Sequence, residues 1–405
     1  MHIGVCSLKF VEWGGGVGFI ENLLYGLAAV PDKVTRITVF VPTHQQSLLR
    51  SLLRKIKRAV RHPSQAKYHL WGTAQTHAPW QGVAALFRTI CPDVVVYDGS
   101  VNELRRHCQR LQVDVVLPSA TPLINFGTPW VGYLYDCQHK HYPQFFKPDD
   151  AANRDRDFAR MLHTAKLVLV NARAVVADLE TFFPDKNAKV VALPFAPVLR
   201  AGSIDSVMAR APVAQQTYGT GTHYFIICNQ FWVHKDHSTA LQAFAQATQD
   251  PSLHSYKLVC TGVMDDYRHP GYCTRLQALC QSLHIADRVV FTGYIDKQDQ
   301  LALLYGATAM VQPTLFEGGP GGGAAFDSVA MGVPSVLSDI PVNLEINDPS
   351  VTFFKTGNPV SLAHALRDVA TAPSVRPPVG TLLQRSGHHA RTLGLSLFDA
   401  AASLL

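Results

Sequence analysis

Two acidic residues, Glu317 and Asp327, lie on either side of the glycines in the stretch LFEGGPGGGAAFDSVAMG. The free backbone N–H groups of such a loop bind phosphate or sugar hydroxyls, and carboxylates beside it accept hydrogen bonds from hydroxyl groups. Paired carboxylates also occur in acid–base hydrolysis. The sequence predicts a loop that binds a phosphate or sugar ligand, and its glycines are Gly318, Gly319, Gly321, Gly322 and Gly323.

A lysine lies in a second turn, within CNQFWVHKDHSTALQAF. Lys235 comes between an expected strand and an expected helix, where its ammonium group can meet a diphosphate as a compact charge. The alternative is a solvated lysine. Asn229 and Gln230 belong to the same turn and are further candidates for binding the same ligand. A nucleotide-sugar ligand would use the lysine, the glycine loop and both acids together.

A third turn follows the first expected strand, in EWGGGVGFIENLLYGLA. Gly15 and Gly16 let the backbone approach a ligand closely, and the helix start attracts an anion or hydroxyl groups. The stretch is neither a GxGxxG dinucleotide motif nor a GxxxxGK phosphate loop. A simple tight turn is the alternative interpretation.

Three polar residues follow an expected strand end in GYLYDCQHKHYPQFF: Asp136, His139 and His141. For His139 we favour a ligand-facing, catalytic role over that of a histidine that braces the loop by hydrogen bonds to the backbone. Asp136 and His141 are candidates for the sugar or acceptor side, and a structural role is the preferred interpretation for His141. Two histidines without further grouped ligands do not form a metal site, so we expect no metal and no other cofactor.

Short β-rich runs alternate with helical segments through most of the chain, which is typical of parallel sheets built from βαβ units. At about 150 residues per domain, the 405 residues favour two domains. The pattern fades over residues 198–222. We therefore expect an α/β protein with Rossmann-like domains at residues 1–200 and 220–380, and a ligand site in the cleft between them.

The composition restricts the class of protein. With 47% hydrophobic residues, 16% charged residues and no apolar run of membrane-spanning length, we expect a cytoplasmic protein. The N-terminus lacks a signal-peptide pattern. The eight cysteines are scattered, and buried thiols are the expected form. The net charge of +6 does not indicate nucleic acid as a partner, although it fits anionic ligands or an anionic membrane surface.

Basic residues are concentrated at 48–62, LLRSLLRKIKRAVRH, where leucines recur at helical spacing. A surface helix packed on a sheet is one interpretation. A basic amphipathic helix on the inner face of an anionic membrane is the other, and both can hold.

These motifs resemble the family 4 glycosyltransferases with the GT-B fold. The similarity is strongest in FTGYIDKQDQLALLYGATAMVQPTLFEGG and DSVAMGVPSVLSDIPVNLEI, and PWVGYLYDCQHKHYPQFF is similar to a subgroup that makes bacterial cell-surface polysaccharides. The resemblance implies transfer of a sugar from a nucleotide diphosphate, with retained configuration, to a glycan or lipid-linked acceptor. The first domain would bind the acceptor and the second the donor, and a helix at about 384–405 would return to the first domain.

Residue by residue, Lys235 matches the family's diphosphate-binding lysine, while Glu317 and Asp327 match its two acids at the sugar and the ribose. Gly15 and Gly16 match its N-terminal loop. The chain departs from the pattern at Gln230, which replaces an arginine, and in the longer spacing between the acids. We expect a metal-independent, front-face transfer. A nucleotide-sugar epimerase and a non-catalytic nucleotide-sugar-binding protein are the alternatives.

Overall fold

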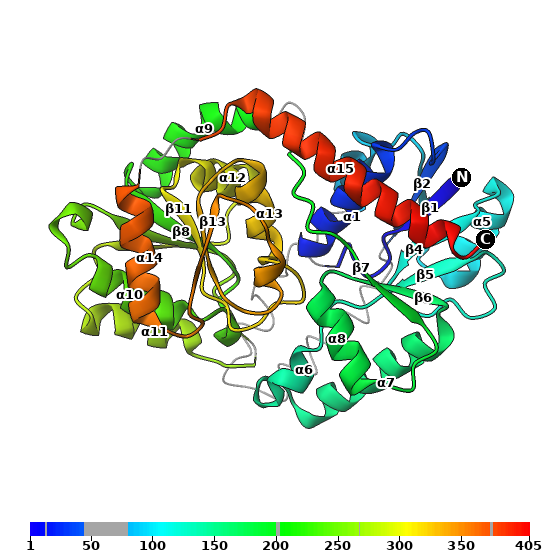
Figure 1. Cartoon of the computed structure of the whole chain (residues 1–405), viewed down its shortest axis with the longest axis horizontal. Coiled ribbons are helices and arrows are strands. Elements are labelled where there is room, and N and C mark those ends of the chain that lie inside the picture. Colours follow the sequence, from blue (N-terminus) through cyan, green and yellow to red (C-terminus); the bar gives the residue numbers. More distant parts are fainter. Residues whose placement is uncertain (13, 44–79, 200–202, 267, 373–375) are drawn as a thin grey trace.

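The computed structural model describes residues 1–12, 14–43, 80–199, 203–266, 268–372 and 376–405. The expected basic helix at 48–62 lies outside these ranges. The described residues form two α/β domains, each built on one parallel sheet (Figure 1).

The first domain contains a seven-stranded sheet in the order β3-β2-β1-β4-β5-β6-β7. All neighbouring strands are parallel, and Val5 pairs with Val39 on one side and Leu117 on the other. The central strands are buried apolar runs, as expected when helices cover both faces of a parallel sheet. The strands are β1 His2–Cys6, β2 Arg36–Pro42, β3 Val94–Tyr97, β4 Val115–Ser119, β5 Trp130–Tyr133, β6 Leu167–Val170 and β7 Lys189–Ala192.

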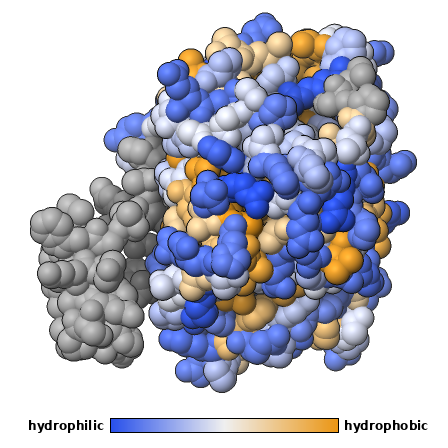
Figure 2. Space-filling model, turned by 90° about the vertical axis from the view of Figure 1, so that its left-hand side faces the viewer, coloured by the Kyte–Doolittle hydropathy of each residue, from blue (hydrophilic) through white to orange (hydrophobic). Residues whose placement is uncertain are grey.

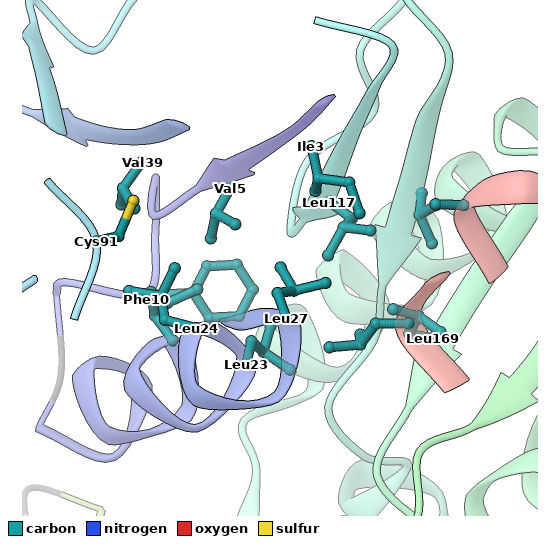
Figure 3. Close-up of a cluster of buried hydrophobic side chains, with 14 of the residues drawn as sticks. Ile3, Val5, Phe10, Leu23, Leu24, Leu27, Val39, Cys91, Leu117 and Leu169 are labelled. Atoms are coloured by element: carbon teal, nitrogen blue, oxygen red, sulfur yellow. The ribbon is translucent and has the colours of Figure 1, made fainter. Parts of the chain in front are cut away.

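Helices alternate with these strands. They are α1 Gly14–Ala28, α4 Trp80–Arg88, α5 Val101–Leu111, α6 Gln138–His141, α7 Pro148–Thr164 and α8 Arg173–Phe182, and a 3-10 turn, η2, spans Pro143–Phe145. Figure 3 shows how α1 contributes to the core: Leu23, Leu24 and Leu27 lie below Val5 and Leu117 of the sheet.

The second domain contains a six-stranded parallel sheet in the order β10-β9-β8-β11-β12-β13. Its strands are β8 Tyr224–Cys228, β9 Lys257–Thr261, β10 Val289–Gly293, β11 Ala309–Gln312, β12 Ser335–Ser338 and β13 Val351–Phe354. Its helices and 3-10 turns are α9 Ser203–Tyr218, η3 Val233–Lys235, α10 His237–Ala247, η4 Pro251–Leu253, α11 Tyr272–Ser282, α12 Lys297–Gly306, α13 Gly322–Ala330, η5 Asn343–Glu345 and α14 Pro359–Thr371. The predicted α/β class with two Rossmann-like sheets is confirmed.

The segment expected to separate the domains contains a helix. α9 buries Ile204, Val207 and Ala214 in an apolar cluster that also contains Leu301 and Leu304 of α12. It therefore packs within the second domain. The helical pattern is weak in the sequence because Pro212 lies inside the helix and small residues alternate with polar ones.

The last helix, α15 Val379–Ala402, spans both domains (Figure 1). Leu382 near its start is buried in the second domain's cluster, whereas Leu393, Leu397 and Ala401 are buried in the core around β1. It packs against α1, and the two backbones approach closely: a Cβ added to Gly394 would lie 2.1 Å from the carbonyl oxygen of Gly26.

Within the described ranges, the structure contains no helix that combines the length and the apolar character of a membrane span. Figure 2 shows one face of the molecule, on which hydrophobic residues are interspersed among hydrophilic ones.

Candidate active site

The order of the second sheet reverses between β8 and β11, and ligands of open α/β sheets bind beyond the carboxyl ends of the strands at such a point. Asn229 directly follows β8, and Gln312 is the last residue of β11. The turn carrying Lys235 and the loop carrying Glu317 extend from these same two strands. The topology therefore brings together residues that are 82 positions apart in sequence.

Four of these side chains form a continuous chain of contacts. Lys235 Nζ lies 2.5 Å from Glu317 Oε1, and the two side chains are 13% and 11% exposed. Gln312 Nε2 donates to the same Glu317 oxygen at 2.8 Å, and Asn229 Nδ2 donates to Gln312 Oε1 at 3.0 Å. A largely buried cation and a largely buried carboxylate thus meet at the reversal point of the sheet.

Two histidines flank Lys235, and both are neutral near pH 7. Burial, aided by the neighbouring Lys235, lowers the pKa of His234 to about 2 and that of His237 to about 3. His237 is stacked on Phe231, with ring centroids 4.4 Å apart. Lys235 therefore carries the positive charge of this turn.

The start of the glycine loop lies against the first domain. A Cβ added to Gly318 would lie 2.2 Å from the carbonyl oxygen of Tyr135 and 2.8 Å from Asp136 Cβ, and one added to Gly319 would lie 2.7 Å from Asn171 Cβ. These two glycines allow contact between the domains. This is a role that the sequence interpretation, which considered only a ligand, did not include.

The later glycines shape the start of α13. Gly321 is its N-cap at φ 60°, and Gly322 follows at φ +59°, a region that favours glycine. Gly323 has open space around it. The loop therefore reaches the helix through backbone conformations that suit glycine.

Asp327 lies within α13 and belongs to a different set of contacts. Its Oδ2 is 2.6 Å from Lys297 Nζ, which also donates to Gln300 Oε1 at 3.1 Å. The Asp327 side chain is 24% exposed. Both predicted acids are thus paired with lysines, and Lys297 was not singled out from the sequence.

On the first domain, Asp136 lies beside the glycine loop and accepts a hydrogen bond from Arg154 at 2.7 Å. His139, for which we expect a ligand-facing role, is buried in the structure. It is 3% exposed, and its Nε2 lies 2.9 Å from Asp155 Oδ1. Burial lowers its pKa. This placement fits the loop-bracing alternative, although the partner is a carboxylate rather than a backbone group.

His141 lies at the boundary between the domains. Its Nε2 is 2.8 Å from Asp178 Oδ1, and its ring centroid is 5.4 Å from that of Phe316, the residue before Glu317. Tyr142 donates a hydrogen bond across the same boundary to the carbonyl oxygen of Leu315 at 3.1 Å. These contacts link α6 to the strand-to-loop connection that carries Glu317.

The remaining candidates occupy two turns. Gly15, which is exposed, and Gly16, which is buried, lie in the first turn of α1, after β1 at the reversal point of the first sheet. Gln230 follows Asn229, and the backbone of both residues is approached closely by Gly262: a Cβ there would lie 2.1 Å from the Asn229 carbonyl oxygen.

Another cross-domain contact was missed in the sequence. The carboxylate of Glu345 accepts hydrogen bonds from the backbone N–H groups of Arg173 at 3.0 Å and Ala174 at 2.8 Å, at the start of α8. Glu345 thus caps a helix of the other domain. The Arg173 side chain adds an exposed ion pair, with its Nε 3.4 Å from Glu345 Oε2. Nothing in the sequence neighbourhood of Glu345 indicates these contacts, because the main-chain donors are 171 and 172 residues away.

A cavity of about 500 Å³ lies beside Glu345, where the connection after β7 meets α15. Phe195, Glu345 and His389 are among its lining residues, and none of the predicted site residues lines it. Among the described residues, no group of three or more His, Cys, Asp or Glu side chains could hold a metal ion.

Comparison with known proteins gives a family match for the second domain and a fold for the whole chain. Residues 214–377 match the family model described as glycosyl transferases group 1. No curated protein sequence matches the chain.

Similar solved structures extend over the whole chain. Sucrose-phosphate synthase from Thermosynechococcus elongatus has a TM-score of 0.56 at 15% identity, covering 100% of this chain and 94% of that one. Anabaena Alr3699/HepE, in complex with UDP-glucose, has a TM-score of 0.56 at 15% identity, with coverages of 100% and 95%. WaaG, a glycosyltransferase involved in lipopolysaccharide biosynthesis, has a TM-score of 0.54 at 15% identity, with 99% of both chains covered.

These likenesses show the GT-B fold, with its two facing parallel-sheet domains. The family match lies in the second domain, which carries Lys235, Glu317 and the glycine loop. Together, the matched domain and the fold of the whole chain identify the protein as a glycosyltransferase.

Proposed function

We propose that the protein is a retaining glycosyltransferase of family 4, which transfers a sugar from a nucleotide diphosphate-sugar to a glycan or lipid-linked acceptor. The observation that carries the proposal is the contact of Lys235 with Glu317 beside the glycine loop. Relatives of the same fold support the donor class, since one was solved with UDP-glucose. The sugar, the nucleotide and the acceptor of this chain are left open.

In the proposed reaction, Lys235 and the loop N–H groups stabilise charge that develops on the departing diphosphate. The acceptor oxygen bonds to the anomeric carbon from the side that the phosphate leaves. The bond between this carbon and the phosphate oxygen breaks with its electron pair on the phosphate, which receives the acceptor's proton. Positioning between the two domains supplies much of the rate, and neither a protein nucleophile nor a metal is part of the proposal.

Glu317 would accept hydrogen bonds from the donor sugar and Asp327 from the ribose, each in competition with its lysine partner. Asn229, Gln230 and the loop glycines would surround the donor, while Asp136 and His141 would lie toward the acceptor. Synthesis of a bacterial cell-surface polysaccharide, at the inner membrane face through residues 48–62, is the proposed setting. The resemblance of PWVGYLYDCQHKHYPQFF to that subgroup supports it.

Replacing Lys235 with alanine tests the proposed function. A thermal-shift screen of UDP-, GDP- and ADP-sugars first identifies a donor, because a ligand that binds the folded state raises the melting temperature. Transfer or donor hydrolysis is then measured in the presence of EDTA. We expect Lys235→Ala to lower kcat roughly 100-fold, the scale for loss of one charge-stabilising group.

Lys166→Ala, which removes an exposed lysine of the first domain, is the matched control and should retain full turnover. Unchanged turnover of Lys235→Ala would contradict the proposed role. Conversion of the donor sugar without an acceptor would instead indicate an epimerase. Binding of a nucleotide sugar without any turnover would indicate a non-catalytic binding protein.

A further inference from the structure

We propose that Gln312 is a positioning residue for glycosyl transfer, which holds the Glu317 carboxylate so that one of its oxygens faces the donor sugar. The inference rests on the function proposed above and adds a residue that neither the motifs nor the family match assigns. It starts from the location of Gln312 at the carboxyl end of β11, where the sheet order reverses.

Gln312 is an amide in an otherwise apolar strand, and it is 1% exposed. A buried amide is costly unless it is hydrogen-bonded. Both ends of this amide are used: Oε1 accepts from Asn229 Nδ2 at 3.0 Å, and Nε2 donates to Glu317 Oε1 at 2.8 Å. Because Asn229 supplies a donor to the oxygen end, the nitrogen end must point toward Glu317.

The two oxygens of Glu317 are therefore not equivalent. Oε1 accepts from both Gln312 and Lys235. Oε2 lies on the side of the glycine loop, where a Cβ added to Gly322 would be 3.5 Å away. The absence of a side chain at Gly322 leaves room beside Oε2, and this is where a sugar hydroxyl could donate to the carboxylate.

A neutral amide is suited to this role because it does not compete for phosphate. Lys235 is the only other group shown to hold Glu317 Oε1 within the described part of the chain, and its ammonium would also attract the donor diphosphate. When the lysine turns toward phosphate, the hydrogen bond from Gln312 remains. Gln312 therefore keeps the Glu317 carboxylate in the same orientation whether or not Lys235 binds the diphosphate.

The test compares two ligands on one variant. Gln312→Met has similar size but provides no hydrogen bond to Glu317. Affinities are measured by titration calorimetry for UDP and UDP-glucose, or for the nucleotide pair that binds the wild-type chain in the same panel. We expect the affinity for the nucleotide sugar to fall about 10-fold, the scale of a hydrogen bond to a charged group. The affinity for the nucleoside diphosphate should stay unchanged.

A second variant, Gln312→Leu, also removes the hydrogen bond to Glu317 and adds no charge beside Lys235, so it should show the same selective loss even if Gln312→Met does not fold. Gln281→Met, on the exposed surface of α11, is the matched control. An equal loss of affinity for both ligands, or no loss for either, would overturn the positioning role of Gln312 but not the proposed function. A wild-type chain that binds none of the panel would overturn the proposed function and this inference with it.

Discussion

The two histidines beside Lys235 are buried in a way that disfavours the charged imidazole. Neither ring nitrogen of His237 has a hydrogen-bond partner among the residues that the structure describes, and burial lowers its pKa to about 3. In the unfolded chain a histidine has a pKa of about 6.5. Between these values the unfolded state binds a proton that the folded state does not.

The free energy of unfolding should therefore be highest above about pH 6.5 and should decrease as the pH falls below it. His237→Phe would remove the contribution of His237, so the loss of stability between pH 7.5 and pH 5 should be smaller by about 2 kcal/mol. Urea unfolding at both pH values measures this difference. His163→Phe, which replaces an exposed histidine, is the control, and an equal effect of both substitutions would contradict the explanation.

At the scale of elements, two glycines, Gly26 and Gly394, allow α15 to pack closely against α1. A Cβ at Gly394 would lie 2.1 Å from the carbonyl oxygen of Gly26, and one at Gly26 would lie 2.9 Å from Leu393 Cγ. Backbone atoms cannot rotate away as a flexible side chain can. The packing of the last helix on the first domain thus depends on the absence of side chains at these two positions.

Gly394→Ala should force the helices apart and lower the free energy of unfolding by roughly 1–3 kcal/mol, the usual cost of overpacking. The same helix offers a matched control, since a Cβ at Gly387 would meet nothing within 4 Å. Gly387→Ala should leave stability unchanged or raise it by up to about 1 kcal/mol, because alanine favours a helix more than glycine does. The melting temperatures of the two variants, measured by thermal unfolding, distinguish these outcomes. Similar changes in melting temperature for both variants would exclude the steric explanation.

At the scale of the whole molecule, the relative position of the domains depends on contacts between main chain and side chain. Glu345 caps α8 across the boundary, Tyr142 donates to the Leu315 carbonyl, and Gly318 lies against Tyr135. These contacts join the glycine loop and η5 of the second domain directly to the first domain. The arrangement is therefore set by the same segments that carry the candidate site.

Glu345→Ala should weaken this arrangement, because a helix cap contributes about 1 kcal/mol and this one links two domains. We expect a larger radius of gyration in small-angle X-ray scattering and a weaker affinity for the donor. Arg173→Ala removes only the ion pair between the Arg173 side chain and Glu345, which contributes little because that side chain is 79% exposed. The backbone N–H groups that bind Glu345 remain, so neither property should change. Unchanged scattering of Glu345→Ala would contradict a role in holding the domains together.

Much of the fold could be predicted because it depends on local patterns. Buried β-rich runs separated by helical segments indicated both parallel sheets, and the strand-end rule indicated that Lys235 and Glu317 would be neighbours. The orientation of His139 could not be predicted, since it depends on Asp155 in a later helix. Gln312 was missed for a similar reason: its partners come from two loops that only the folded sheet brings together.

The position of α15 also has a consequence for biosynthesis. Leu393, Leu397 and Ala401 fill part of the core around β1, yet they are synthesised almost 400 residues after that strand. During synthesis on the ribosome, part of the apolar core of the first domain therefore stays uncovered until the whole second domain has emerged. Its core can close only once α15 has left the exit tunnel, so the first domain to be made is the last to be completed.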